Sequence, residues 1–165
     1  MDPEPTSAPI RADLEWLLGV DLRDLTSESG WIAAAFCEQN GLSINEFRAL
    51  LFVMVAEANG MALSAGDLRD RMGLSGAAIT YLVDRMVGQD HLCRETDPTD
   101  RRRVILRHAD HGRDIAQTLF AGFGEAGDMA LDGVPDADLE AAHRVLRAFI
   151  EAMTTARIPE RSEQL

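Results

Sequence analysis

Three consecutive arginines, Arg101, Arg102 and Arg103, stand in the segment DPTDRRRVILR, residues 97–107. The guanidinium group binds phosphate and carboxylate through several fixed N–H donors, yet the whole chain of 165 residues carries a formal charge of -12. Residues 68–107 hold eight arginines and six acids, whereas the rest of the chain holds eight arginines and 22 acids. This distribution fits an anionic partner that docks at the middle segment alone. It fits a solvated turn equally well, so charge by itself does not decide between the two.

Helix and strand signals divide the chain into short elements with recognisable ends. Ser43 and Glu46 form a capping box, in which the serine accepts from the third helical N–H and the glutamate reaches back. Ser64 and Asp67 form a second, weaker box, and Asp97-Pro98-Thr99-Asp100 has turn chemistry. The predicted helices are 13–40, 44–58, 65–72, 76–88, from about 110 to the break at Gly133-Val134-Pro135, and 136–155, and the predicted strands are 91–95 and 103–107.

The middle elements have the order of a winged helix-turn-helix: a short helix, a turn at Gly73, a helix capped by Ser75, and a hairpin. In that arrangement the second helix faces the major groove of DNA. Guanidinium groups at the hairpin tip reach the neighbouring minor groove, where the potential is most negative. The predicted fold class is therefore mainly α with a small β-hairpin, a winged helix-turn-helix plus a helical dimerisation region. The predicted division is a disordered leader (1–10), an N-terminal dimerisation helix (11–42), the winged lobe (43–109), C-terminal dimerisation helices (110–156) and a frayed tail (157–165).

Two segments, GLSGAAITYLVDRM (residues 73–86) and DPTDRRRVILR (residues 97–107), resemble the DNA-binding core of the MarR family of bacterial transcription regulators. The family's Asp-x-Arg wing motif falls on Asp100 and Arg102. The resemblance implies an obligate homodimer built from the first and last helices, with double-stranded DNA as its partner and the chain itself as the other. It also implies a ligand or oxidant that changes the separation of the two lobes, and a bacterial cytoplasm as the location.

The resemblance also implies roles for single residues. Arg102 is the expected minor-groove residue, and Asp100, which repels phosphate, is expected to brace the wing by binding an arginine or the backbone. Ser75 opens the recognition helix, where the helix N-terminus can hold a phosphate. The expected DNA-binding residues are Ser75, Thr80, Tyr81, Arg85, Arg94, Arg101, Arg102 and Arg103, with Arg94 and Arg101 serving phosphate or the wing.

Three positions depart from the family pattern. The polar or basic residues that usually follow the helix cap are replaced by Gly76, Ala77 and Ala78. We therefore expect few direct hydrogen bonds to bases, and we expect recognition of DNA shape by the wing to contribute more to specificity. Asp90 replaces a glycine before the first wing strand. His108-Ala109 replaces the usual Leu-Thr at the start of the fifth helix, which leaves Asp110 as the expected cap.

The sequence leaves several alternative hypotheses of function open. His108, Asp110 and His111 could ligate zinc, as in some relatives, and Cys37 or Cys93 could sense an oxidant. A small aromatic effector is the family default, with Trp16, Trp31 and Phe47 as the guessed cleft, and no cofactor is expected. A dimeric scaffold that has lost DNA binding is a further alternative. The chain shows no phosphate-binding glycine loop, nucleophile elbow or convergent carboxylate pair, so we do not expect an enzyme; nor does it show a membrane span or signal peptide.

Overall fold

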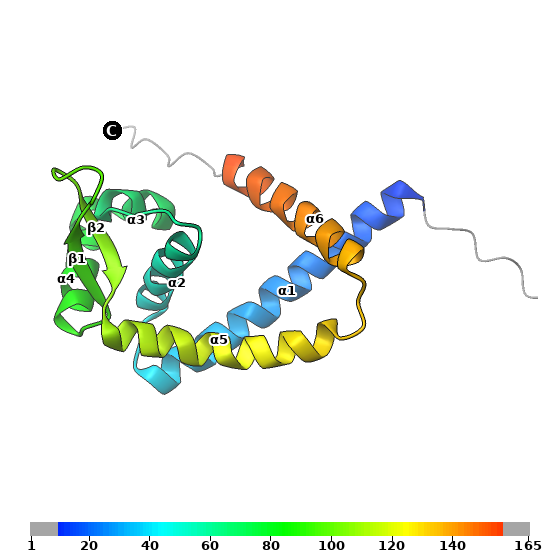
Figure 1. Ribbon diagram of the computed structural model, residues 1–165, viewed down its shortest axis with the longest axis horizontal. Coiled ribbons are helices and arrows are strands. Elements are labelled where there is room, and N and C mark those ends of the chain that lie inside the picture. The colour runs from blue at the N-terminus through cyan, green and yellow to red at the C-terminus, as the bar shows by residue number, and fades with distance from the viewer. Residues whose placement is uncertain (1–9, 157–165) are drawn as a thin grey trace, which may run out of the picture.

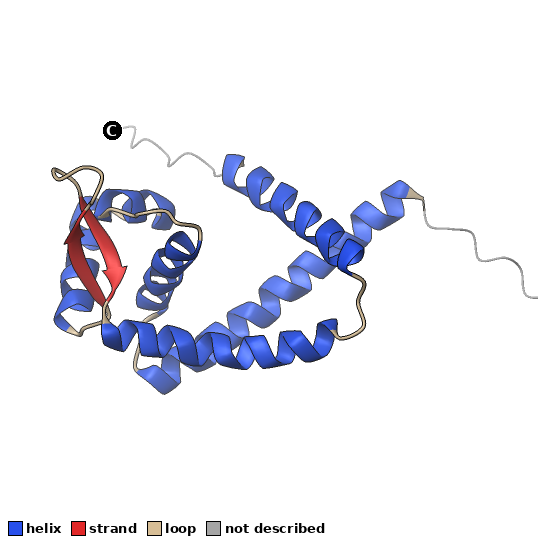
Figure 2. Ribbon diagram, viewed as in Figure 1, coloured by secondary structure: helices blue, strands red, loops and turns tan. Residues whose placement is uncertain are grey.

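A computed structural model describes residues 10–156; of the predicted leader and tail, residues 1–9 and 157–165 lie outside the described part. The described chain is helical except for one hairpin (Figures 1 and 2). None of its helices has the length and apolar character needed to cross a membrane. The elements are α1 (Arg11–Asn40), α2 (Ile44–Ala58), α3 (Ala65–Met72), α4 (Gly76–Gly88), β1 (Leu92–Thr96), β2 (Val104–His108), α5 (Asp110–Leu131) and α6 (Asp136–Thr155).

A lobe formed by α2, α3, α4 and the hairpin lies at one end of the molecule, and α1 and α5 extend away from it (Figure 1). Helix α6 returns at the far end and crosses α1. The core belongs to the lobe and to the parts of α1 and α5 that pack on it. Its fully covered side chains include Val53, Leu68, Val83, Met86, Leu92 and Leu106.

The predicted helix starts are confirmed by their caps. Both capping boxes close: Ser43 accepts from the backbone N–H of Glu46 and Ser64 from that of Asp67, while each carboxylate binds the backbone N–H of its serine. Helix α3 ends at Gly73, whose φ of 65° lies in the left-handed region that glycine reaches without strain. Because the signals are local, the sequence specified these ends closely.

The hairpin is antiparallel, with Leu92 opposite His108 and Thr96 opposite Val104. Both strands therefore lie one residue later than predicted. The reason lies before β1, where Asp90 adopts a φ of 58° and the backbone N–H of His91 still binds the carbonyl of Met86 to close α4. Leu63 extends the sheet, because its carbonyl accepts from the N–H of Leu106 at 2.7 Å.

Helix α5 differs from the expectation at its first residue. The N-cap position is Ala109, which makes no side-chain cap hydrogen bond, and Asp110 already belongs to the helix. The start is held instead by packing and by the backbone, since the N–H of Gly112 binds the carbonyl of Asp90 at 3.1 Å. A Cβ on Gly112 would lie 1.9 Å from the carbonyl oxygen of His91, so only glycine allows this approach.

Candidate nucleic-acid interface

Helix α4 presents one face to the outside of the lobe. Ile79, Leu82, Val83 and Met86 are buried, whereas Ala77, Ala78, Thr80 and Tyr81 are exposed. Ser75 caps the helix, because its hydroxyl accepts from the N–H of Ala78 at 3.3 Å. The helix begins at exposed residues, and an exposed helix N-terminus favours an anion.

The hairpin tip lies at the edge of the same lobe, where α3 and the two strands meet (Figure 1). Arg101 and Arg102 are exposed there, and within residues 10–156 their guanidinium groups form no ion pair. The carboxylate of Asp100 accepts from the backbone N–H of Arg102 at 3.0 Å. Asp100 thus binds the turn backbone, and the two side chains beside it are free to meet an outside anion.

Arg103 occupies a different position from the one expected. Its Nη2 donates to Oδ2 of Asp67 at 2.6 Å and to the carbonyl of Ala62 at 3.1 Å, and its Nη1 approaches Asp97 at 3.4 Å. The hydrogen bond to Asp67 is the main reason that the pKa of Arg103 lies above its ordinary value. This arginine therefore ties the wing to α3, and a DNA contact by Arg103 stays a prediction.

Asp97 organises the turn, a role that sequence reasoning did not assign. Its side chain is buried, and Oδ1 accepts from the N–H and the hydroxyl of Thr99 at 2.8 and 2.6 Å. These hydrogen bonds, followed by one from the N–H of Asp100 and the charge of Arg103, hold the pKa of Asp97 below its ordinary value. The aspartate at the start of the turn signal was the clue that could have assigned it.

Arg85 and Arg94 also form ion pairs with carboxylates of the protein itself. Arg85 Nε lies 3.0 Å from Oε1 of Glu46, a carboxylate that is 1% exposed, close enough for charge pairing though not aligned as a hydrogen bond. Arg94, on β1, pairs with Asp84 on α4. Arg85 thus neutralises a buried charge, and Arg94 links the wing to the recognition helix. A DNA contact by either arginine stays a prediction.

The candidate zinc ligands do not converge. His108 is buried, with Nδ1 2.8 Å from Glu57 and Nε2 3.1 Å from the carbonyl of Leu50, while His111 stacks on His91 with ring centroids 5.1 Å apart. Asp110 faces Arg113. In the described part of the chain, no three potential ligands lie together as a metal site.

The two thiols lack the features of reactive cysteines. Cys37 is buried, and burial together with the charge of Glu46 raises its pKa. Burial, then the charges of Glu95 and Glu57, raises the pKa of Cys93. Since the thiolate is the reactive form, both surroundings suppress reactivity.

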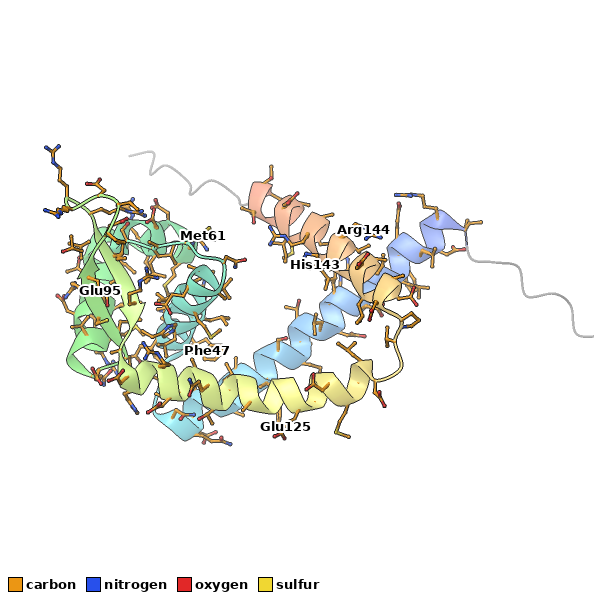
Figure 3. The ribbon with its side chains drawn as sticks, in the orientation of Figure 1. Phe47, Met61, Glu95, Glu125, His143 and Arg144 are labelled. Atoms are coloured by element: carbon orange, nitrogen blue, oxygen red, sulfur yellow. The ribbon has the colours of Figure 1, made fainter. Side chains whose placement is uncertain are left out.

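The three residues of the guessed aromatic cleft lie in different surroundings, and the cleft stays a prediction. Trp16 and Trp31 are 66% and 72% exposed on α1, whereas Phe47 is buried at the junction of α2 and α5 (Figure 3) and packs on Phe36. An open cavity of about 600 Å³ lies beside this aromatic pair, between the end of α1 and the middle of α5, and Phe36 lines it. Its lining comprises Ile32, Phe36, Gln39, Asn40, Thr118, Leu119, Gly122 and Ala126.

Residues 40–103, the segment that contains the helix-turn-helix and the wing tip, match the sequence model of the MarR family. This 64-residue segment is similar to the MarR family. The chain is 36% identical over 64 residues to the uncharacterized HTH-type transcriptional regulator YcgE of Bacillus subtilis, a match that covers 39% of this chain and 42% of that protein. It is 24% identical over 109 residues to the HTH-type transcriptional regulator MhqR of the same organism, covering 66% and 72%. These curated relatives are thus named as regulators and not as enzymes.

Solved structures show the MarR-family fold over most of the chain. A mutant of MepR from a multidrug-resistant clinical isolate of S. aureus superposes with a TM-score of 0.68 at 15% identity, covering 82% of this chain and 96% of that one. A MarR family protein from Bacillus stearothermophilus gives 0.62 at 20% identity, covering 88% and 99%. MepR of S. aureus in a DNA complex gives 0.52 at 15% identity, covering 79% and 96%.

Proposed function

We propose that this chain is a DNA-binding transcriptional regulator of the MarR family that binds a pseudo-palindromic operator as a homodimer and represses transcription. The observation that carries the proposal is the pair of free arginines, Arg101 and Arg102, at the tip of a braced hairpin beside the exposed face of α4. A recognition helix in the major groove and a wing arginine in the minor groove would use both surfaces at once. MepR of S. aureus, which has a similar fold and was solved in a DNA complex, supports the proposal that this fold binds DNA.

Dimerisation is supported by apolar side chains that the single chain leaves uncovered. Leu14, Leu17 and Leu25 on α1 and Ile150 and Met153 on α6 are each at least 45% exposed. The exposed apolar surface on these two neighbouring helices is larger than one lobe can cover, and a second copy of the chain would bury it. Light scattering at micromolar concentration should give twice the 18.1 kDa chain mass.

A pair of charge substitutions tests the dimer surface. Ile150→Glu places a carboxylate in the apolar stripe of α6 and is expected to give monomers, whereas Thr155→Glu, on a different face of the same helix, should leave the dimer intact. A monomeric wild type would remove the dimer from the proposal.

The operator itself is sought by retaining genomic fragments on the protein and footprinting those that bind. We expect two half-sites about one helical turn apart. If no fragment is retained at low salt, the protein does not bind DNA specifically, and a dimeric scaffold becomes the better description.

Response to a small effector is supported by the cavity between α1 and α5. Its apolar walls and neutral polar edge, from Gln39, Asn40 and Thr118, suit an uncharged aromatic molecule. Gly122 lines this cavity and Gly124 does not, and a Cβ at either position would meet nothing within 4 Å. Gly122→Leu should therefore abolish the thermal shift produced by a simple phenol, while Gly124→Leu should preserve it; equal shifts in both variants would place the effector elsewhere.

A further inference from the structure

The outward face of α4 carries polar side chains that the protein already uses. The hydroxyl of Ser75 caps the helix, and the hydroxyl of Thr80 donates its proton to the carbonyl of Gly76 at 2.9 Å. Asp84 is paired with Arg94 and Arg85 with the buried Glu46. Releasing Arg85 to a base would leave the Glu46 carboxylate buried without its counter-charge, which is strongly unfavourable.

What remains free at the start of this face is small and mostly apolar. Ala77 and Ala78 expose their methyl groups, and Tyr81 is 70% exposed. In the described part of the chain the Tyr81 hydroxyl has no hydrogen-bond partner. A Cβ on Gly76 would meet nothing within 4 Å, so the absence of a side chain there is not imposed by packing within the chain. The helix can therefore approach the floor of a groove closely, with methyl groups leading.

In the major groove only thymine, among the four bases, presents a methyl group, and alanine is one of the side chains that make apolar contact with it. Guanine is read by a free arginine or lysine and adenine by asparagine or glutamine. This face offers none of these groups free. Its chemistry therefore selects thymine and selects the other bases weakly.

We propose that the recognition helix reads thymine C5-methyl groups through Ala77 and Ala78, and that the hydroxyl of Tyr81 is its one free hydrogen-bonding reader. This inference rests on the proposed DNA binding and names the half-site chemistry that the protein prefers. It assigns sequence reading to van der Waals fit, whereas the wing arginines supply charge and sense groove width.

The test replaces thymine by deoxyuridine, which removes the methyl group and keeps base pairing. The probe is the genomic fragment recovered by retention, with each thymine of one half-site replaced in turn and a thymine of the central spacer replaced as the control. Loss of one well-packed methyl contact is expected to weaken binding about fourfold. The spacer replacement should leave the dissociation constant unchanged.

Protein variants assign the methyl contacts to residues. Ala77→Gly and Ala78→Gly should each weaken binding to thymine DNA, and each should abolish the deoxyuridine effect at one position. Glycine also loosens the helix, but that effect is the same on both DNAs and cancels in the comparison. Tyr81→Phe should relax base preference at one position, whereas Thr80→Val, which removes a hydroxyl already bonded to Gly76, should not.

The outcomes distinguish a failure of this inference from a failure of the proposed DNA binding. A wild type that retains no fragment contradicts DNA binding itself. Tight binding that is indifferent to deoxyuridine at every half-site thymine overturns methyl reading and leaves DNA binding intact. A deoxyuridine effect that persists in both glycine variants overturns the assignment to Ala77 and Ala78.

Discussion

The Nη2 atom of Arg103 lies 2.6 Å from Oδ2 of Asp67, so the last arginine of the basic block is directed into the lobe while its two neighbours are directed out. Asp67 also closes the capping box of α3. Burial alone would raise the pKa of Asp67, but the hydrogen bonds from Ser64 and Arg103 outweigh it and the pKa lies below its ordinary value. One carboxylate therefore holds both the helix start and the wing.

Removing this link should affect stability as well as binding. Arg103→Met is expected to lower the melting temperature and to make the hairpin sensitive to protease, because Asp67, Asp97 and the carbonyl of Ala62 lose their shared donor. Arg101→Met removes the same charge from an exposed side chain and should leave the melting temperature unchanged. Equal melting temperatures for both variants would show that the Arg103 brace contributes nothing to the fold.

Substitutions of the two free arginines should weaken DNA binding in different ways. Arg102→Ala is expected to cost about 1–3 kcal/mol of binding and to relax the preference for narrow, A·T-rich flanks, because a minor-groove contact senses groove width. Arg101→Ala should weaken all sequences alike and reduce the slope of log affinity against log salt by about one, as for a single phosphate contact. Fluorescence anisotropy across salt concentrations measures both.

Asp100→Ala separates a shaped wing from a patch of charge. Its carboxylate binds the N–H of Arg102, so we expect the variant to bind DNA less tightly although it removes a negative charge. A pure charge effect predicts the opposite. Tighter binding, with unchanged circular dichroism, would show that the tip acts by charge alone.

Glu46 and Arg85 should behave as a coupled pair. Arg85→Met leaves a 1% exposed carboxylate without its partner. We expect about 2–3 kcal/mol of destabilisation, less than the roughly 3–5 kcal/mol of a fully buried pair, because Arg85 itself is partly exposed. Adding Glu46→Gln removes the buried charge and should restore most of the stability in urea denaturation. Additive losses in the double variant would refute the coupling.

His91 should make the fold sensitive to mild acid. Burial, followed by electrostatic repulsion from His111 and from Arg85, lowers its pKa from 6.5 against the opposing charges of Glu46 and Asp90. The folded state therefore favours neutral His91. Its stability contribution is complete above about pH 6.5 and is lost as the pH falls from there through the lowered pKa.

The measurement is the melting temperature between about pH 5 and 7.5, a range in which most carboxylates stay ionised. The wild type should lose stability toward pH 5, and His91→Leu should lose less. His143→Gln, on exposed α6, should follow the wild type. A His91→Leu profile parallel to that of the wild type would mean that His91 does not carry the acid sensitivity.

Local chemistry allowed the sequence alone to determine the order and ends of the elements. The serine caps at 43, 64 and 75 and the glycine at 73 act within one turn of chain, so the predicted helices 44–58, 65–72, 76–88 and 136–155 coincide with the observed ones. The wing tip could also be predicted from the sequence, because its turn residues and arginines are consecutive. The MarR-family resemblance added the expected pairing of that tip with the recognition helix.

The use of each arginine was decided only by the tertiary structure. Arg101, Arg102 and Arg103 are chemically identical neighbours, and nothing local distinguishes the one that faces Asp67, 36 residues earlier in the chain. Arg85 is likewise paired with Glu46, because α2 packs against α4 and brings a buried carboxylate to it. The place of the cavity has the same origin. Ion pairs and cavities depend on which surfaces meet in space, whereas caps and turns depend on neighbours along the chain.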